Sequence, residues 1–233
     1  HQLEIVNDQQ TEPVFGLEAA GFVEYADGAA ITPGAGYFST RNGSSIIAFR
    51  AGQGSIDRGL RLIGAHTDSP CLKVKPKPEK AQHSLQQLGV EVYGGALLNP
   101  WFDRDLSMAG RLSYEDQSGH IKQTLINFET PLAVIPSLAI HLDREANSNR
   151  TVNPQTDLPP VLMQVPESDT TSFVDLLSQQ VRTESGISAR KVLGYELSFY
   201  DAQEASFVGL RDDFIASARL DNLLSCYFGL QSL

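Results

Sequence analysis

The sequence predicts an α/β protein in which a β-rich block interrupts the chain. Two short apolar runs near the start, residues 45–49 and 60–65, are bounded by glycine and rich in Ile and Leu, as is typical of buried strands. Residues 88–135 read as short strands without a long helical period between them. Apolar residues at helical spacing follow this block, within 173–181 and again within 220–228.

The second apolar run leads directly into a polar cluster at residues 66–70. Open α/β sheets place their ligand sites at the carboxyl ends of strands, so this position predicts a functional loop. Residues 73–80 then alternate Lys with Pro, and proline can neither donate to a central strand ladder nor continue a helix. We interpret this segment as a solvated linker and as the first domain boundary.

The elements expected beyond that boundary are mostly strands. They are short and are separated by Gly, Asp or Pro, at residues 89–95, 106–114, 121–128 and 133–135. One helix is expected from Phe173 to a stop signal at Gly186, followed by a strand at residues 195–200. A loop from Phe214 leads into a last apolar helix without a stop signal, so we expect a truncation at Leu233.

These boundaries predict three segments. Residues 1–75 form the first part of one domain, residues 76–193 form an inserted β-rich domain, and residues 194–233 return to the first domain, which is cut short.

Composition argues against several classes of partner. A formal net charge of -10 does not suit a protein that collects phosphates, which needs clustered Lys and Arg, so we expect no nucleic-acid partner. No stretch reaches the about 18 consecutive apolar residues of a membrane helix, so no membrane partner is expected either. The two cysteines, Cys71 and Cys226, are too few for a disulfide framework and favour a cytoplasmic protein with reduced thiols.

His66 and Asp68 form the sharpest chemical signal. Imidazole is the commonest nitrogen ligand of zinc, and a nearby carboxylate can orient the ring toward the metal. On an extended segment, residues two apart point to the same side, so both side chains can address one cavity. Any His-X-Asp tripeptide also occurs by chance, and spacing alone leaves both interpretations open.

Three further residues have a structural and a functional interpretation. Asp221 starts an apolar helix, where a carboxylate either binds a ligand or complements the helix dipole. His141 ends the apolar run 137–140, where a lone histidine is usually a hydrogen-bonded core residue. Arg104, inside the aromatic and acidic segment 101–105, is expected to pair with a nearby carboxylate in a packed turn.

Several familiar catalytic motifs are missing from the sequence. It contains no Gly-X-Ser-X-Gly nucleophile elbow, no phosphate-binding glycine loop followed by Lys and Ser or Thr, and no His-Glu-X-X-His. Hydride transfer, phosphoryl transfer and serine hydrolysis are therefore disfavoured.

Four segments taken together resemble one enzyme family. Residues 64–70, 101–106, 135–142 and 218–223 are similar, in this order, to motifs of the M18 aminopeptidases, the aspartyl aminopeptidase family, and particularly of its bacterial members. The resemblance runs from about residue 36 to residue 233 and is more specific than any single tripeptide. It identifies the chain as the N-terminal half of such a protein.

The resemblance implies a zinc-peptidase α/β sandwich interrupted by an inserted β-rich dimerisation domain. His66 matches a zinc ligand, Asp68 the supporting carboxylate, and Asp221 the carboxylate that bridges two metal ions. His141 matches a residue offered to a neighbouring subunit's active site, so Asp68 and His141 are the catalytic candidates. The family also needs a downstream Glu-Glu pair, another Asp and a C-terminal His, and the sequence ends before them. We expect His66 and Asp68 at the end of a central strand, with Asp221 in metal-bridging reach.

The implied reaction is the removal of N-terminal residues, including acidic ones, from peptide substrates with two Zn²⁺ ions per complete site. A homo-oligomer through the inserted domain, either a dimer or a dodecamer built from dimers, is implied as well. The chain alone should bind zinc weakly and be inactive, because about three or four ligands are needed per ion. Two alternatives stay open: a non-catalytic assembly module, and another binuclear amidohydrolase on the same scaffold.

Overall fold

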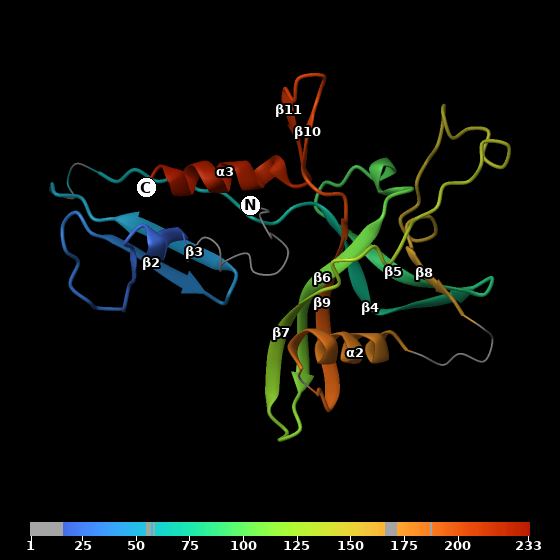
Figure 1. Cartoon of the computed structure of the whole chain (residues 1–233), viewed down its shortest axis with the longest axis horizontal. Helices are drawn as coiled ribbons and strands as arrows, with labels where there is room; N and C mark the ends of the chain where they lie inside the picture. Colours follow the sequence, from blue (N-terminus) through green and yellow to red (C-terminus); the bar gives the residue numbers. More distant parts are fainter. Residues whose placement is uncertain (1–15, 55–56, 58, 166–171, 187) are drawn as a thin grey trace. The chain divides into compact units, whose positions relative to one another are not determined.

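Two compact units make up the chain (Figure 1). The computed structural model describes residues 16–54, 57, 59–165, 172–186 and 188–233. Unit 1 contains the described residues up to Ser69 together with Arg219–Leu233, and unit 2 is Pro70–Ala218. The borders of unit 2 lie outside the predicted insertion, residues 76–193, because the strands that flank the insertion are themselves members of the unit 2 sheet.

Unit 1 is built on a three-stranded sheet and one helix. The strands are β1 (Val23–Glu24), β2 (Gly36–Arg41) and β3 (Ser45–Arg50), in the order β1-β2-β3, and the helix is α3 (Leu220–Gln231). β3 confirms the strand predicted at residues 45–49. The small core joins the sheet to α3 and consists of Leu17, Phe22, Phe38, Ile46, Ala48 and Leu230.

The prediction of a second strand in this unit, at residues 60–65, is wrong. The structure gives this segment no regular secondary structure, and its apolar side chains are exposed, with Leu62 at 87%. A strand exists only with a partner for its ladder, and no described strand pairs with this segment. The loop at residues 66–70 therefore does not follow a strand end in this structure.

Unit 2 contains a six-stranded sheet in which every pair is antiparallel. Its spatial order is β7-β6-β9-β4-β5-β8. The strands are β4 (Cys71–Gln82), β5 (Leu85–Tyr93), β6 (Leu106–Glu115), β7 (Ile121–Asn127), β8 (Val161–Gln164) and β9 (Lys191–Asp201). A 3-10 turn, η2 (Asn99–Trp101), precedes β6, and a separate hairpin of β10 (Ser206–Val208) and β11 (Phe214–Ala216) follows β9.

The prediction of a solvated linker at residues 73–80 is wrong, because these residues lie in β4, an inner strand. Proline is tolerated because the β4–β5 register shifts between Val74 and Glu79, so Pro76 and Pro78 fall outside the regular ladder. The Tyr195 hydroxyl from β9 donates to the carbonyl of Lys75 at 2.7 Å within this irregular stretch. The two prolines mark a β-bulge instead of a domain boundary.

The predicted helix is confirmed as α2 (Phe173–Ser185), which lies across the sheet (Figure 1). Ser172 and Asp175 form a capping box at its start, and Gly186 ends it in the left-handed conformation with φ of 64°. Phe173, Leu177 and Val181 are buried on one helix face and join the core of the sheet. Unit 2 therefore has a hydrophobic core of its own.

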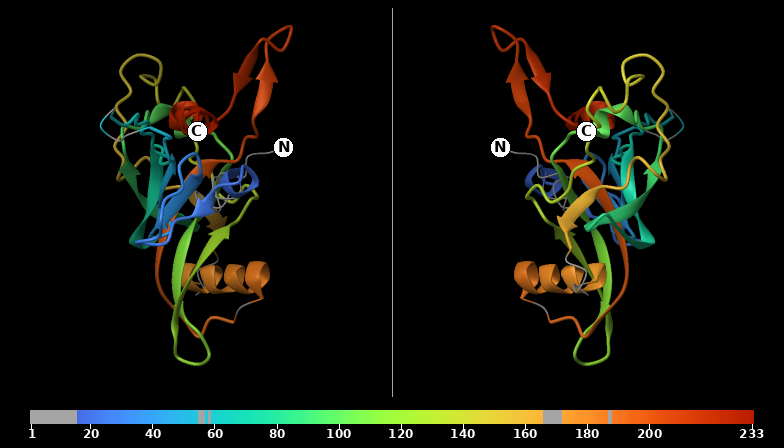
Figure 2. Two further views of the ribbon diagram at one scale, coloured as in Figure 1. Left: turned by 90° about the vertical axis from the view of Figure 1, so that its left-hand side faces the viewer. Right: turned by 90° about the vertical axis from the view of Figure 1, so that its right-hand side faces the viewer.

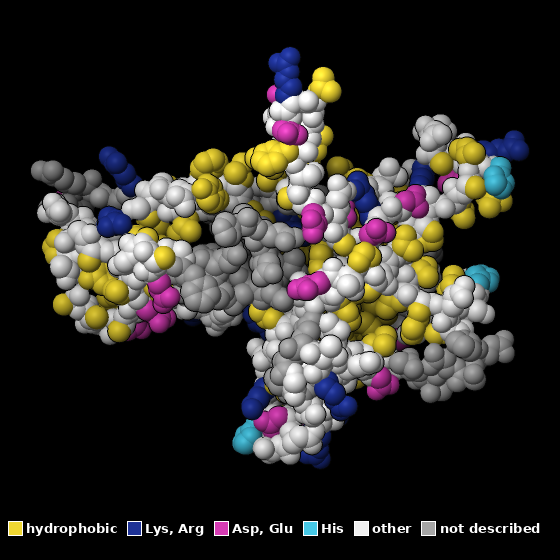
Figure 3. All heavy atoms as spheres, in the orientation of Figure 1, with side chains coloured by type: hydrophobic (Ala, Val, Ile, Leu, Met, Phe, Trp, Pro, Cys, Tyr) yellow, Lys and Arg dark blue, Asp and Glu magenta, His cyan; other side chains and the backbone are white. Residues whose placement is uncertain are grey.

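Several apolar residues of unit 2 remain outside that core. Figure 3 shows hydrophobic side chains along the β10–β11 hairpin, where Phe207, Phe214 and Ile215 are all at least 65% exposed.

No helix among the described residues is long and apolar enough to cross a membrane.

Candidate metal site

The loop that carries His66 and Asp68 runs beside α3 in unit 1. The Cys226 thiol of α3 donates to the carbonyl oxygen of His66 at 3.2 Å, across 160 positions of sequence. The Ser69 hydroxyl donates to the carbonyl oxygen of Asp221 at 3.3 Å. A methyl group of Ile63 fills the space beside Gly229, so the loop follows α3 in the opposite direction. The fold thus brings Asp221 next to the loop, although unit 2 separates them in sequence.

The geometry around His66 fixes the tautomer of its ring. Nδ1 lies 3.1 Å from Oδ1 of Asp68 and 3.0 Å from the carbonyl oxygen of the same residue. A carbonyl and an ionised carboxylate can only accept hydrogen bonds, so Nδ1 must carry the proton. In the neutral ring, Nε2 then presents its lone pair, which is the form that binds a metal ion.

Both side chains of this pair face solvent. The His66 side chain is 60% exposed and that of Asp68 is 55% exposed. An exposed polar pair contributes little to stability, because water competes for the same groups and ordering the side chains costs entropy. The pairing of His66 with Asp68 therefore orients a ring more than it holds the fold together.

Asp221 lies at an irregular start of α3. Arg219 caps the helix in the left-handed conformation, and Asp221 has extended torsion angles, φ of −87° and ψ of 109°. The Asp221–Asn222 peptide bond is cis. Because its backbone is not helical, the exposed Asp221 does not hold the usual place of a carboxylate in the first turn of a helix. This weakens the structural interpretation of Asp221 as a dipole partner.

The arrangement brings candidate ligands together without completing a set. Among the residues that the structure describes, no three His, Cys, Asp or Glu side chains gather closely enough to hold a metal ion. His66 offers one nitrogen, and Asp221 lies beside the same loop, because its backbone carbonyl accepts from Ser69. Nitrogen and carboxylate oxygen are donors that suit zinc, whose sites usually have about four ligands.

Sequence reasoning missed the role of Cys226, because nothing local connects it to a loop 160 positions away. Burial raises the pKa of its thiol, which therefore stays protonated at neutral pH and serves as a donor to the loop. Cys71, which is close to the loop in sequence, is half-buried in β4 of unit 2.

His141 belongs to unit 2 and is not a core residue. It lies in an exposed turn closed by a 2.8 Å hydrogen bond from the Leu142 amide to the carbonyl of Ala139. Burial along this segment ends at Ile135, and Leu138 and Ile140 of the apolar run are more than half exposed. The interpretation of His141 as a packed histidine is therefore wrong, since the turn carries the run out of the sheet core.

A polar hollow of about 400 Å³ lies elsewhere on unit 2, around the segment 101–105. Arg104 donates there to Asp201 at 3.1 Å and to Gln203 at 3.0 Å, which confirms the expected pairing with a carboxylate. The backbone N–H of Ser137 donates to Asp103 and lowers the pKa of that carboxyl. These contacts tie the start of β6 to the end of β9 and to the His141 segment.

A comparison with protein families gives one match over nearly the whole chain. Residues 16–233 match the family described as aminopeptidase I zinc metalloprotease (M18). The chain belongs to the M18 family. The segments 64–70, 101–106, 135–142 and 218–223 all fall inside the matched region, as the resemblance in sequence predicted.

Curated M18 relatives are similar throughout the chain. The probable M18 family aminopeptidase 2 of Pseudomonas entomophila (strain L48) is 56% identical over 220 residues, and that of Ectopseudomonas mendocina (strain ymp) is 57% identical over 220 residues. Each alignment covers 93% of this chain and 51% of the relative. The chain spans about half the length of the curated relatives it matches.

Solved M18 structures share the fold. The chain matches Chaetomium thermophilum mApe1 with a TM-score of 0.83 and 32% identity, covering 99% of this chain and 55% of that one. Ape4, solved in complex with Nbr1, gives a TM-score of 0.82 and 35% identity, over 94% and 46% of the two chains. Aminopeptidase I from Borrelia burgdorferi B31 has the same fold, with a TM-score of 0.73 at 22% identity.

Proposed function

We propose that this chain supplies part of the active site of a zinc-dependent aminopeptidase. The observation that carries the proposal is the fixed tautomer of His66, whose Nδ1 proton faces two acceptors of Asp68. A histidine that binds a metal almost always gives its other ring N–H to a carboxylate or a carbonyl. Here both kinds of acceptor come from one residue two positions away.

The donors present fit zinc as a partial site. His66 Nε2 and the Asp221 carboxylate would hold the metal, with Asp221 in the bridging position between two ions. Asp68 would not touch the metal and would keep the His66 ring in the correct tautomer. We propose that the remaining ligands and the general base come from the part of the M18 relatives that this chain does not span.

When bound, zinc would supply a Lewis acid and a water molecule with a pKa of about 7. The chain's own residues set the conditions for that chemistry. Asp68 accepts a hydrogen bond from the Nδ1–H of His66, so that in the neutral ring Nε2 is the nitrogen that offers its lone pair to the metal. The hydrogen bonds from Ser69 and Cys226 hold the loop against α3 and limit its movement.

The proposed substrates are peptides with a free N-terminus, and we extend this to acidic N-terminal residues. The proposed location is the cytoplasm, where both cysteines can remain as the free thiols seen in the structure.

Self-assembly through unit 2 is the second part of the proposal. The exposed apolar residues Leu138, Ile140 and Leu142 surround His141, and exposed apolar clusters of this kind mark interaction surfaces. In an oligomer, this turn would offer His141 to the active site of a neighbouring subunit. The role of residues 76–193 as a dimerisation domain belongs to the same proposal.

A non-catalytic assembly module is the main alternative. In this alternative the exposed apolar turn around His141 serves assembly alone, and His66 and Asp221 bind no metal. Another binuclear amidohydrolase would use the same donors on a different substrate.

Peptidase assays on the product of the complete gene separate these functions. We expect release of N-terminal residues from short peptides, loss of activity with a chelator, and recovery with zinc. His66→Ala and Asp221→Ala should each lower kcat/KM by at least about a hundredfold, because each removes a metal ligand. Asp27→Ala, an exposed carboxylate elsewhere in unit 1, is the control. Full activity in both site variants would rule out His66 and Asp221 as metal ligands, and a wild type that releases no N-terminal residues would leave the assembly module as the better account.

A further inference from the structure

A long irregular segment of unit 2 carries His141. Residues 135–160, all within the described part of the chain, form no helix and no strand between the bridge at Val134 and the start of β8. Figures 1 and 2 show much of this segment, coloured yellow, standing away from the sheet. Loops longer than about 12–15 residues without secondary structure are uncommon in compact domains, and functional loops are among the main exceptions.

The loop is fixed at its start by Asp103. The Asp103 amide donates to the carbonyl of Ile135 at 2.9 Å, and the Asp103 Oδ1 accepts from the Ser137 amide at 2.8 Å. Asp103 has a left-handed backbone, with φ of 56°, which is uncommon for residues other than glycine and is best tolerated by Asp and Asn. One residue thus bonds the loop through both its backbone and its side chain.

The far end of the exposed turn is held at the same place by Arg150. Its guanidinium carbon lies 4.0 Å from the centre of the Phe102 ring, a distance at which a cation is attracted to an aromatic face. The Ser137 amide is the main cause that lowers the pKa of Asp103, and the positive charge of Arg150 adds to it. Both ends of the loop 137–150 therefore meet at Phe102 and Asp103.

The turn that makes these contacts is itself tied to the sheet. Arg104 donates to the carbonyl of Pro100 at 3.2 Å and to Asp201, at the end of β9, at 3.1 Å. Phe102 belongs to the hydrophobic core of unit 2. By contrast, the hydrogen bonds that the structure describes for residues 139–149 join these residues to one another. The place of the exposed turn therefore depends on its two anchored ends.

We propose that Phe102 and Asp103 are positioning residues, which hold the two ends of the loop 137–150 so that His141 is presented to the active site of a neighbouring subunit in one geometry. The inference rests on the proposed role of His141 and adds the residues that set its place. Fixing a loop close to both ends reduces the conformations of the residues between them. A displacement of about 1 Å at a reacting group can cost about a hundredfold in rate, so this restriction affects catalysis. The segment 101–106, one of the four motifs of the family, thereby gains a role in the reaction.

Two substitutions at Asp103 separate its side chain from its backbone. Asp103→Gly keeps the left-handed backbone, because glycine adopts it without strain, and removes the acceptor for Ser137. Asp103→Asn keeps a side-chain carbonyl oxygen, and asparagine also tolerates this backbone. We expect faster hydrogen–deuterium exchange over residues 137–150 in Asp103→Gly, and exchange close to that of the wild type in Asp103→Asn. Arg150→Gln, which removes the cation over Phe102, should also speed exchange there.

Kinetics of the product of the complete gene test whether this contact acts through His141. Asp103→Gly should lower kcat about tenfold with little change in KM, and Asp103→Asn should retain most of the wild-type kcat. In the background of His141→Phe, Asp103→Gly should cause no further loss, because a positioning residue acts only through the group that it positions. Sedimentation velocity should show the same oligomer in every variant.

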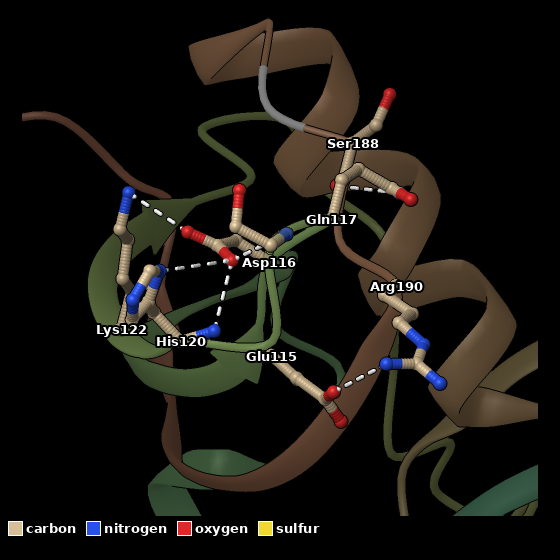
Figure 4. A network of polar contacts seen from close by, with 8 residues as sticks. Glu115, Asp116, Gln117, His120, Lys122, Ser188 and Arg190 are labelled. Atoms are coloured by element: carbon tan, nitrogen blue, oxygen red, sulfur yellow. Dashed lines mark hydrogen bonds and ion pairs between the residues drawn. The ribbon is translucent and has the colours of Figure 1, made fainter.

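Asp116→Gly is the matched control for the loss of a carboxylate that holds a turn. Asp116 accepts from the backbone amides of Ser118 at 2.8 Å and His120 at 3.0 Å, in the turn shown in Figure 4. This turn carries no proposed catalytic group, so the control should lower stability and leave kcat unchanged.

The same measurements separate this inference from the proposed function. Additive losses in the double variant, or wild-type exchange over residues 137–150 in Asp103→Gly, would overturn the inference. Unaltered kinetics in Asp103→Gly alone would overturn it as well and leave the role of His141 standing. Unaltered kinetics in both Asp103→Gly and His141→Phe would overturn that role together with the inference, but not the zinc chemistry.

Discussion

At the scale of single residues, the proposed chemistry depends on Asp68. Its carboxylate and its carbonyl both face Nδ1 of His66, which leaves one ring nitrogen for the metal. The sequence could suggest this pair because both residues lie in one tripeptide. The tethers from Cys226 and Ser69 could not be predicted, because they depend on how α3 returns to the loop after unit 2.

Replacing Asp68 tests the orientation of the ring. In Asp68→Ala the carboxylate acceptor is lost, so we expect a mixture of His66 tautomers in the ¹⁵N chemical shifts of the ring. Zinc affinity should fall about 10-fold to 100-fold, the usual effect of losing a partner that orients a ligand. Asp27→Ala serves as the control. An unchanged tautomer in Asp68→Ala would show that backbone contacts alone orient the ring.

A second prediction at this scale concerns Asp116 and acid stability. The backbone N–H of His120 at 3.0 Å is the main cause that lowers the pKa of this carboxyl to about 2, aided by Lys122. Because the folded pKa lies below the ordinary 3.8, Asp116 stabilises the folded state above about pH 3.8. That contribution disappears as the pH falls through about 2.

Urea unfolding of wild type and Asp116→Asn at several pH values measures this linkage. The difference in midpoint should be constant above about pH 5 and shrink toward zero near pH 2. Asp143→Asn, a carboxylate outside this turn, is the control. A difference that persists at pH 2 would mean that the turn is not held by the ionised carboxylate.

At the scale of elements, local signals were the reliable ones. The spacing of Phe173 and Leu177, with a stop at Gly186, predicted α2 because a helix is determined largely within its own segment. The run at residues 60–65 has the composition of a strand, but a strand also needs a partner, which composition cannot supply. Pro76 and Pro78 suggested a linker, because a β-bulge cannot be distinguished from a break in sequence alone.

The cap of α2 gives a direct prediction for this element. Ser172→Ala removes the hydroxyl that accepts from the Asp175 amide, which should cost about 1 kcal/mol of unfolding free energy. Urea unfolding monitored by circular dichroism measures the change in unfolding free energy. Ser178→Ala is the control, because the Ser178 hydroxyl bonds only within the helix. Equal effects of both variants would show that the capping box contributes nothing specific.

At the scale of the whole molecule, two units divide the proposed roles. Unit 1 carries the proposed metal donors, and unit 2 carries His141. The family could be predicted from sequence because four short motifs recur in order. The closeness of Asp221 to the His66 loop was expected only from the family resemblance, because the whole of unit 2 separates the two in sequence and no local pattern connects them.

His141 connects assembly with catalysis in this account. In the product of the complete gene, His141→Phe should lower kcat about 100-fold with the oligomer intact, if the ring stabilises the transition state across an interface. Parallel kinetics and sedimentation measurements separate the two effects. His120→Phe, another exposed histidine of unit 2, should leave both unchanged. Unaltered kinetics in His141→Phe would show that His141 takes no part in catalysis.

The central claim is that His66 and Asp221 are zinc ligands, and a zinc titration of this chain tests it most directly. Competition with a chromophoric chelator gives the dissociation constant for wild type, His66→Ala, Asp221→Ala and the control His120→Ala. The account predicts weak binding by the wild type, because few of the about four usual ligands are present. It also predicts that zinc affinity falls by at least about a further tenfold in each of the two site variants and does not change in the control. Zinc affinity that is unchanged by both His66→Ala and Asp221→Ala would contradict the account.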